Sequence, residues 1–282
     1  MNAPKILSAV MLAAVCAILS VSCEPLEPST YSERLFRVGT VRLNSLGTKA
    51  YIVNDSFPGN SEESFALRNF RTAADMKKFG VENNDRVVAV MDFNAVGSMA
   101  NAQITLEGLQ KIEVSKFAAK RPSDTLNYNY FFCPFTLVNV KYPPIWAVGH
   151  IVNIAPIYYI PESGAEGKFQ LDPVVFRKDT LFARLYSYIP DIDISQTPPA
   201  QSLLCFDIAS LREPSDDAVN QNIRTAILDS LSELKTKRHK DTFTLTVVTP
   251  DSLRSYSAGS DDVRWRHPML DHAVSVSVKF DF

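Results

Sequence analysis

An apolar run extends from Ile6 to Val21 and follows a single positive charge at Lys5. A run of this length behind a short positive segment is typical of a secretory signal, whereas a membrane-spanning helix needs roughly 20 apolar residues. Cys23 follows the run at the position where bacterial lipoproteins are cleaved and acylated. We therefore predict a signal peptide over residues 1–22 and a lipid anchor on Cys23, with an ordinary cleaved signal as the alternative.

Hydrophobic and polar residues alternate along the next part of the chain, which is the pattern of β-strands with one buried face. The alternation predicts strands over residues 36–43, 49–53, 64–70, 86–93 and 102–114, with a short helix over 72–79. Thr72 can cap that helix and Gly80 can end it. This order of elements is that of the OB-fold, a five-stranded Greek-key barrel. It predicts an OB-like domain over residues 36–116, after a tether over residues 23–35.

After a polar break over residues 116–129, short apolar segments resume between clusters of Pro, Gly, Asp and Ser. They predict the strands of a β-sandwich over residues 130–140, 146–159, 174–188, 202–210, 242–249 and 273–282. Residues 217–237 differ, because apolar residues recur there every three or four positions. That period predicts an amphipathic helix over an end or an edge of the sandwich. We therefore predict a mainly β chain, with the sandwich domain over residues 117–282.

Composition and charge narrow the class of protein. Hydrophobic residues make up 46% of the chain, with 17 Phe and 10 Tyr, which is enough for a folded core. The formal net charge is −2 at pH 7. A nucleic-acid partner would call for a strong basic excess, so we predict that nucleic acid is not a partner.

The chain has four cysteines, of which Cys16 lies in the predicted signal and Cys23 is the predicted lipid carrier. Cys133 and Cys205 remain. An oxidising compartment would permit a disulfide between them. Both lie in apolar, strand-like segments, where a free cysteine behaves as a small hydrophobe, so we favour buried free thiols over the disulfide.

Sequence motifs of common enzyme chemistries are absent, among them the P-loop, the Gly-rich dinucleotide turn, HExxH, CxxC pairs and GxSxG. His267 and His272, with Asp271 between them, could ligate a metal from one loop, but their spacing suits neither a helix nor a strand and a third ligand is not evident. Asp191 and Asp193 could bind Ca²⁺ or serve glycoside hydrolysis, although such pairs are ordinary in Pro-rich and Ser-rich turns. We predict no catalytic residues, no metal and no cofactor.

Two sets of residues are candidates for ligand recognition. Trp265 stands between Arg264 and Arg266, and a Trp flanked by Arg in a loop can stack on a sugar ring or pair with anions. The alternative is a Trp that packs back onto the rim of the sandwich. In the OB-like domain, Arg42 lies on the expected ligand face. The other residues expected on that face are Lys49, Tyr51 and Arg68.

Residues 145–154 resemble a segment of the NigD-like family of bacterial lipoproteins. In that family a Trp-containing strand opens the C-terminal domain and runs through a Gly into an aliphatic-Asn-aliphatic end. Trp146, Gly149 and Asn153 occupy these positions here. Residues 86–93 are also similar to the family's fourth OB strand, and residues 204–211 to its Phe-Asp-Leu segment.

The resemblance to the NigD-like family extends over residues 36–282. It implies an OB domain followed by a sandwich domain, a location in the cell envelope and no catalytic residues that could be carried across. The family's links to bacteriocin operons imply an immunity-type role.

We predict a non-enzymatic lipoprotein held in the outer membrane through Cys23, which acts as a binding or interaction module. The ligand could be a glycan, a peptide or another envelope protein. One alternative is a hydrolase of envelope polysaccharide. Another is a structural or assembly subunit whose last strand, over residues 273–282, pairs with a neighbouring molecule by β-augmentation.

Overall fold

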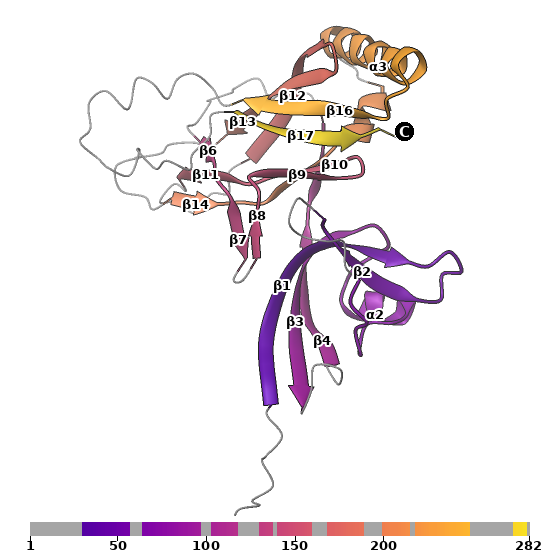
Figure 1. Cartoon of the computed structure of the whole chain (residues 1–282), viewed down its shortest axis with the longest axis vertical. Coiled ribbons are helices and arrows are strands. Elements are labelled where there is room, and N and C mark those ends of the chain that lie inside the picture. The colour runs from indigo at the N-terminus through magenta and orange to yellow at the C-terminus, as the bar shows by residue number, and fades with distance from the viewer. Residues whose placement is uncertain are drawn as a thin grey trace, which may run out of the picture.

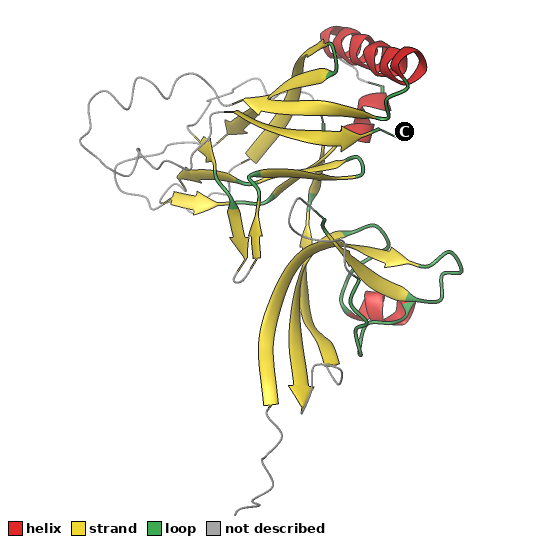
Figure 2. Ribbon diagram, viewed as in Figure 1, coloured by secondary structure: helices red, strands yellow, loops and turns green. Residues whose placement is uncertain are grey.

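The structure is a computed structural model that describes residues 30–56, 64–96, 103–117, 130–137, 140–159, 168–188, 199–214, 218–248 and 273–280. Strands dominate this part of the chain, as Figure 2 shows, and it contains two α-helices. The predicted mainly β class is therefore confirmed. No helix among the described residues is long and apolar enough to cross a bilayer.

The N-terminal sheet has the strand order β2-β1-β3-β4, and every pair in it is antiparallel (Figure 1). Its strands are β1 (Thr30–Leu43), β2 (Ala50–Asn54), β3 (Arg86–Val96) and β4 (Gln103–Ile112). β1 begins inside the predicted tether, because Thr30 already pairs with Val96 of β3. The sheet therefore extends closer to the start of the chain than hydrophobic alternation indicated.

The predicted third strand, over residues 64–70, forms two single bridges instead of a ladder. Ser64 bridges to Val53 of β2, and Leu67 bridges in parallel to Ile104 of β4. These contacts touch both edges of the N-terminal sheet in the order of an OB barrel. Single bridges in place of ladders leave the sheet OB-like without closing it.

The predicted helix over residues 72–79 is confirmed as α2 (Ala73–Lys78). Thr72 accepts a hydrogen bond from the backbone of Asp75, and the Asp75 side chain accepts one in return, which makes a capping box. Gly80 follows the helix with φ of +70°. Met76 packs from α2 into a core with Val41, Ile52 and other apolar residues of the N-terminal sheet.

The C-terminal strands form the two layers of a sandwich and a small hairpin. One layer contains sheets of order β5-β15-β10-β9 and β14-β11-β6, the facing layer has the order β12-β13-β16-β17, and β7 pairs with β8. The strands are β5 (Val114–Lys116), β6 (Tyr130–Phe132), β7 (Phe135–Leu137), β8 (Val140–Tyr142), β9 (Ile145–Val148), β10 (Ile151–Ile154), β11 (Pro156–Tyr159), β12 (Lys168–Arg177), β13 (Thr180–Tyr188), β14 (Pro199–Gln201), β15 (Leu204–Asp207), β16 (Thr242–Val248) and β17 (Ala273–Lys279).

The long predicted helix is confirmed as α3 (Ala218–Arg238). Ile227, Leu231 and Leu234 bury one face of it in the core of the sandwich. α3 contacts β12, an edge strand of its sheet, and the 3₁₀ helix η2 (Ile208–Arg212). It therefore covers an edge of the sandwich, which is one of the two positions that the sequence predicts.

Candidate functional site

Residues on the outer face of β1 differ in their exposure to solvent: some are buried, one is exposed and one lines a cleft. Side chains two positions apart point to the same face of a strand, so Phe36, Val38, Thr40 and Arg42 share one face. Val38 is fully buried, Thr40 is nearly so, and Arg42 is exposed. Phe36 is half-buried and lines a cleft. This face packs against the C-terminal strands. One part of the interface between them is buried, and another part is open to solvent.

The closed part, which we call the buried junction, is built around an ion pair. Arg86 at the start of β3 donates from Nη1 to Oδ1 of Asp55 at 2.6 Å, and from Nη2 to Oδ2 of the same residue. Its Nη1 also donates to Thr40 Oγ1 at 2.8 Å. Arg86 is 2% exposed and Asp55 is 1% exposed, so both charges are removed from water. Such a pair is tolerated only when its partners satisfy both ions.

Residues of the C-terminal strands complete the buried junction. Trp146 donates from Nε1 to Asp55 Oδ2 at 2.7 Å, and Arg86 donates from Nη2 to Asn153 Oδ1 at 2.8 Å. Cys205 Sγ lies 3.0 Å from the same Asn153 oxygen and donates to it. Side chains from two strands of the C-terminal part thus hydrogen-bond to the ion pair of the N-terminal part, and Cys205 from a third strand hydrogen-bonds to one of them.

This geometry explains the segment that resembles the NigD-like family. β9 and β10 form a hairpin, and Gly149 sits in its turn with φ of +58°, a conformation that favours glycine. Trp146 and Asn153 are direct cross-strand partners in that hairpin. The hairpin therefore presents an indole donor and an amide acceptor side by side to the Arg86–Asp55 pair.

Electrostatics favour the charge on Arg86. Burial opposes the charge on Arg86, but the hydrogen bonds and the negative charge of Asp55 outweigh it and raise the pKa of Arg86. Burial also raises the pKa of the Cys205 thiol to about 11, so Cys205 is a neutral donor at neutral pH. Cys133 and Cys205 are both free thiols; Cys205 is buried and Cys133 is partly exposed.

The open part of the same interface is a cleft of about 720 Å³, which we call the junction cleft. One wall comes from the outer face of the N-terminal sheet, and its apolar residues are Phe36, Val88, Val90 and Ile112. The other wall comes from the C-terminal strands and includes the β7–β8 hairpin, which extends toward β1 in Figure 1. The apolar residues of the second wall are Phe135, Leu137, Leu203 and Leu204. All eight side chains are partly exposed.

Polar groups stand at intervals along the junction cleft. Gln110 lies on β4, and Gln201 on β14 donates from Nε2 to the carbonyl of Cys133 at 3.1 Å. The hydroxyls of Tyr158 and Ser202 are hydrogen-bonded to each other at 2.7 Å. Lys111 adds a positive charge from the strand that contains Gln110, and Glu113 adds a negative charge from the position directly after that strand. The lining thus combines apolar side chains with a few amides, hydroxyls and opposite charges, and a mainly apolar wall with a small number of polar groups is usual for a binding pocket.

The structure brings together only some of the residues predicted to bind a ligand. Arg42 is exposed, donates to Asn84, and has Tyr51 as its direct cross-strand partner. Arg68 donates instead to Gln103 on β4. Lys49 is exposed and directly precedes β2. Cys23, Arg264, Trp265 and Arg266 lie outside the described part of the chain. The ligand role of Arg42 stays a prediction.

One of the remaining chemical candidates, His150, lies in the described part of the chain. His150 pairs through Nδ1 with Asp207 Oδ1 at 2.7 Å, and the same carboxylate oxygen accepts from the backbone of Ala209 at the start of η2. No group of three or more His, Cys, Asp or Glu among the described residues could hold a metal ion. His267, His272, Asp191 and Asp193 lie outside these residues.

Sequence reasoning missed the junction cleft. Its wall residues follow ordinary strand alternation, and alternation alone does not show whether an apolar face is covered. The signal that could have indicated a second covered face is Val87–Met91 in β3, where apolar residues occupy both faces of the strand instead of one.

No protein-family model and no curated protein matches the chain. Several solved structures are similar to it at low identity. A candidate lipoprotein from Bacteroides fragilis is 12% identical, with 90% of this chain and 99% of that chain covered and a TM-score of 0.45. A candidate toxin-related protein from Parabacteroides distasonis is 14% identical, with 88% and 95% covered and a TM-score of 0.43. A NigD-like immunity protein from Bacteroides caccae is 12% identical, with 77% and 84% covered and a TM-score of 0.37.

Proposed function

We propose that the protein is a lipid-anchored, non-enzymatic binding module of the cell envelope, and that the junction cleft receives an extended segment of a partner protein. The observation that carries the proposal is the pair of facing apolar walls, whose large side chains are left partly exposed. Contiguous apolar surface of this kind on a folded protein marks a site of interaction. The family resemblance makes a bacteriocin or another envelope protein the partner class to test first.

The lining favours a peptide over a sugar. Aliphatic side chains and two Phe rings form most of the walls, and such surfaces fit the apolar side chains of a partner. The amides of Gln110 and Gln201 can hydrogen-bond to the backbone of an extended segment between those side chains.

A display library of random peptides tests the proposed site. We expect the peptides that bind the full chain to carry large apolar side chains, and we expect Val90→Asp in the junction cleft to abolish their binding. Val174→Asp is the matched control, because Val174 is also a strand valine but lies outside the cleft and is 53% exposed. Equal binding by both variants, or binding that is confined to glycans, would contradict the proposal.

A glycan panel tests the non-enzymatic part. Incubation of the pure full chain with envelope polysaccharides should leave their chain lengths unchanged. Release of shorter products that is lost when one acidic residue is substituted would overturn this part of the proposal and favour the hydrolase alternative.

The lipid anchor is tested in cells by fractionation and intact mass. The expected product begins at Cys23, carries acyl chains and sediments with the outer membrane. Cys23→Ser should lose both the acyl mass and the membrane association, because acyl chains hold a protein to a bilayer by burying their methylene groups. Cys16→Ser is the control and should lose neither. A mature protein without acyl mass would contradict the proposed anchor.

A further inference from the structure

One wall of the junction cleft contains a strand that is paired on one edge and half open on the other. Residues 199–201 and 204–207 pair with β11 and β10 in the same register, and between them the backbone N–H of Ser202 donates to the carbonyl of Pro156 at 3.2 Å. Residues 199–207 thus form one continuous edge along β11 and β10. On the second edge, Cys205–Asp207 pair in parallel with β5, but no described strand pairs with residues 199–204.

The ladder between β5 and β15 stops where the junction cleft begins. Continued toward lower residue numbers, its register would place residues 110–113 opposite residues 201–204. These two runs of consecutive residues line the junction cleft, one on each wall. Successive side chains point to opposite faces of a strand, so a cleft that touches four consecutive residues touches the edge of that strand. The junction cleft is therefore the place where a parallel ladder has opened.

The edge of β4 is also open at this level. β4 is the last strand of its sheet, and one of its edges pairs with β3 up to Ile112. On the other edge, Leu67 forms a single bridge to Ile104, and the side chain of Asn69 hydrogen-bonds to the backbone of Leu106. Beyond Leu106, no described residue pairs with this edge. Open strand edges of this kind pair with extended segments of other chains.

The backbone N–H of Leu203 faces the opened side of its strand. Successive N–H groups of a strand point to alternate edges, and the N–H of Ser202 is used on the paired edge. The N–H of Leu203 therefore points to the other edge, where no described residue accepts a hydrogen bond from it. Leu203 lines the junction cleft and is only partly buried. The cleft thus offers a backbone donor that a strand can use.

Charge narrows the kind of partner. Lys111 and Glu113 are the charged residues among those described in the lining of the junction cleft. Lys111 is paired with Asp85 at 2.9 Å, whereas no described basic group pairs with Glu113. Glu113 is exposed, so the cleft keeps a negative charge where the ladder opens. A basic side chain of a partner is attracted to this position.

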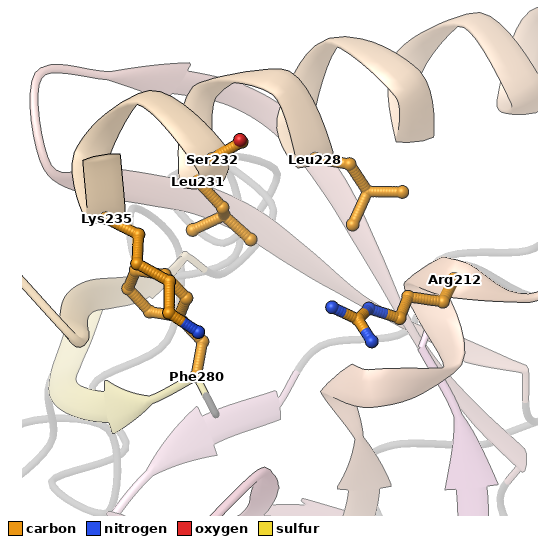
Figure 3. A pocket seen from close by; sticks show the side chains of 6 residues that line it. All are labelled: Arg212, Leu228, Leu231, Ser232, Lys235 and Phe280. Atoms are coloured by element: carbon orange, nitrogen blue, oxygen red, sulfur yellow. The ribbon is translucent and has the colours of Figure 1, made fainter. Parts of the chain in front are cut away.

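Another hollow, of about 250 Å³, lies between α3, η2 and the end of β17 (Figure 3). Four of its six lining residues come from α3, and Arg212 comes from η2. Hydrogen bonds within a helix already use the backbone groups along it. This hollow therefore presents side chains, whereas the junction cleft also presents strand edges.

We propose that the partner segment binds in the junction cleft as a β-strand that pairs with residues 110–113 on one side and with residues 201–204 on the other. This inference rests on the proposed function of the cleft and specifies how the cleft binds its partner. The segment would carry large apolar side chains at alternate positions and a basic residue next to Glu113. Four residues of a strand extend over roughly 13 Å, so a segment of about five residues fills the opened ladder.

A synthetic hexapeptide, acetyl-Lys-Leu-Thr-Leu-Thr-Leu-amide, is the probe. Its fluorescently labelled form is titrated with the full chain in lipid nanodiscs, and fluorescence polarisation measures binding. Replacing one backbone amide by an ester removes an N–H without adding bulk. Successive N–H groups of a strand held between two edges are all used, so an ester at an odd or at an even position should weaken binding about fivefold, which is the scale of a neutral hydrogen bond.

The pattern of losses separates this inference from the proposed function. Losses at alternate positions only would overturn the two-sided pairing. Binding that Val90→Asp abolishes but that every ester leaves intact would overturn the strand and keep the cleft as a binding site. The same holds if library peptides bind the cleft and the hexapeptide does not. If neither binds, both proposals fail.

Amide hydrogen exchange gives a matched pair on the protein itself. The N–H of Leu203 should exchange about tenfold more slowly when the hexapeptide is present at about ten times its Kd, because exchange then requires the peptide to leave. The N–H of Ser202 is the control, since it is already bonded to Pro156 in the free protein. Unchanged exchange at Leu203 in the presence of bound hexapeptide would overturn the proposed pairing.

A matched pair of acidic residues tests the charge. Glu113→Gln should weaken binding of the hexapeptide about threefold, which is the scale of an exposed ion pair. Asp229→Asn removes the same charge from an exposed position of α3 and should leave the affinity unchanged. Equal weakening by both variants would show a general charge effect and contradict the placement of the basic residue next to Glu113.

Discussion

The buried junction and the junction cleft lie on the same face of the N-terminal sheet but are built in opposite ways. In the buried junction, Arg86 and Asp55 are almost completely covered, and side chains from both parts of the chain bind them. In the junction cleft, the residues are apolar and partly exposed, and the two walls stand apart. Polar groups close the buried junction, whereas apolar groups in the junction cleft remain accessible to solvent.

The difference indicates separate roles for the two regions. The buried junction holds the two parts of the chain together, and the junction cleft binds a partner. A buried ion pair gives little net stability, but each of its groups requires the others, so it fixes how two surfaces meet. Once the buried junction fixes that geometry, it also sets the spacing between the two walls of the junction cleft. We infer that substitutions in the buried junction change stability, and that substitutions in the junction cleft change binding.

The largest effect is expected for Asp55→Ala. This variant leaves the Arg86 guanidinium buried without its counter-ion and removes the acceptor of Trp146 Nε1. Breaking a buried pair on one side costs about 3–5 kcal/mol. Urea denaturation followed by Trp fluorescence measures the loss. The double variant Asp55→Leu with Arg86→Met should recover a large part of it, because no charge is then left buried. A loss below about 1 kcal/mol in Asp55→Ala would show that water reaches the pair.

A smaller loss of unfolding free energy is expected for Asn153→Ala. Its amide oxygen accepts from both Arg86 and Cys205, and its amide nitrogen donates to the carbonyl of Trp146. Leaving such buried groups unsatisfied costs about 1–3 kcal/mol. The control is Asn94→Ala, at an exposed position of β3. Equal stability of the two variants would show that the amide is not needed for closure.

Cys205 gives the buried junction a dependence on pH. Burial raises the thiol pKa from 9.0 to about 11, so the folded protein holds this proton more tightly than the unfolded chain does. The resulting stabilisation is complete below pH 9 and is lost as pH rises through about 11. Cys205→Ala should therefore flatten the fall of unfolding free energy in this range. Part of the fall should remain, because burial also raises the pKa of Tyr130 and of Tyr142.

If the alkaline fall is the same in Cys205→Ala as in the parent protein, the thiol is not shielded from water as its burial indicates. Reaction of the folded protein with a thiol reagent gives an independent measure. Cys133 should react first, since it is partly exposed and Cys205 is buried.

Local sequence patterns predicted most elements, but not how they meet. Apolar residues at spacings of three and four predicted α3, and the capping residues Thr72 and Gly80 predicted α2. Both kinds of signal depend only on residues a few positions apart. Residues 64–70 have strand character yet form only two bridges, since ladder formation depends on partners far along the chain.

The sites depend on contacts that local patterns do not encode. Asp55 and Arg86 are separated by 31 residues, and Asp55 and Trp146 by 91 residues. The resemblance to the NigD-like family marked Trp146 and Asn153 but not Asp55, which accepts the hydrogen bond of Trp146. The junction cleft was missed because covered and uncovered apolar faces have the same alternation.

The smallest effect on stability is expected in the junction cleft, and a matched pair of valines measures it. Val38 and Val90 lie on adjacent strands of the same sheet face, but Val38 is fully buried while Val90 is partly exposed and lines the cleft. Val38→Ala should cost about 2 kcal/mol, from two lost methyl groups and a residual cavity. Val90→Ala removes the same atoms and should cost less than about 1 kcal/mol. Equal losses would mean that the walls of the cleft support each other as a closed core does. A small loss of unfolding free energy in Val90→Ala together with weaker peptide binding would instead support the proposed difference between the two regions. The two methyl groups of Val90 would then contribute to partner binding and little to the stability of the fold.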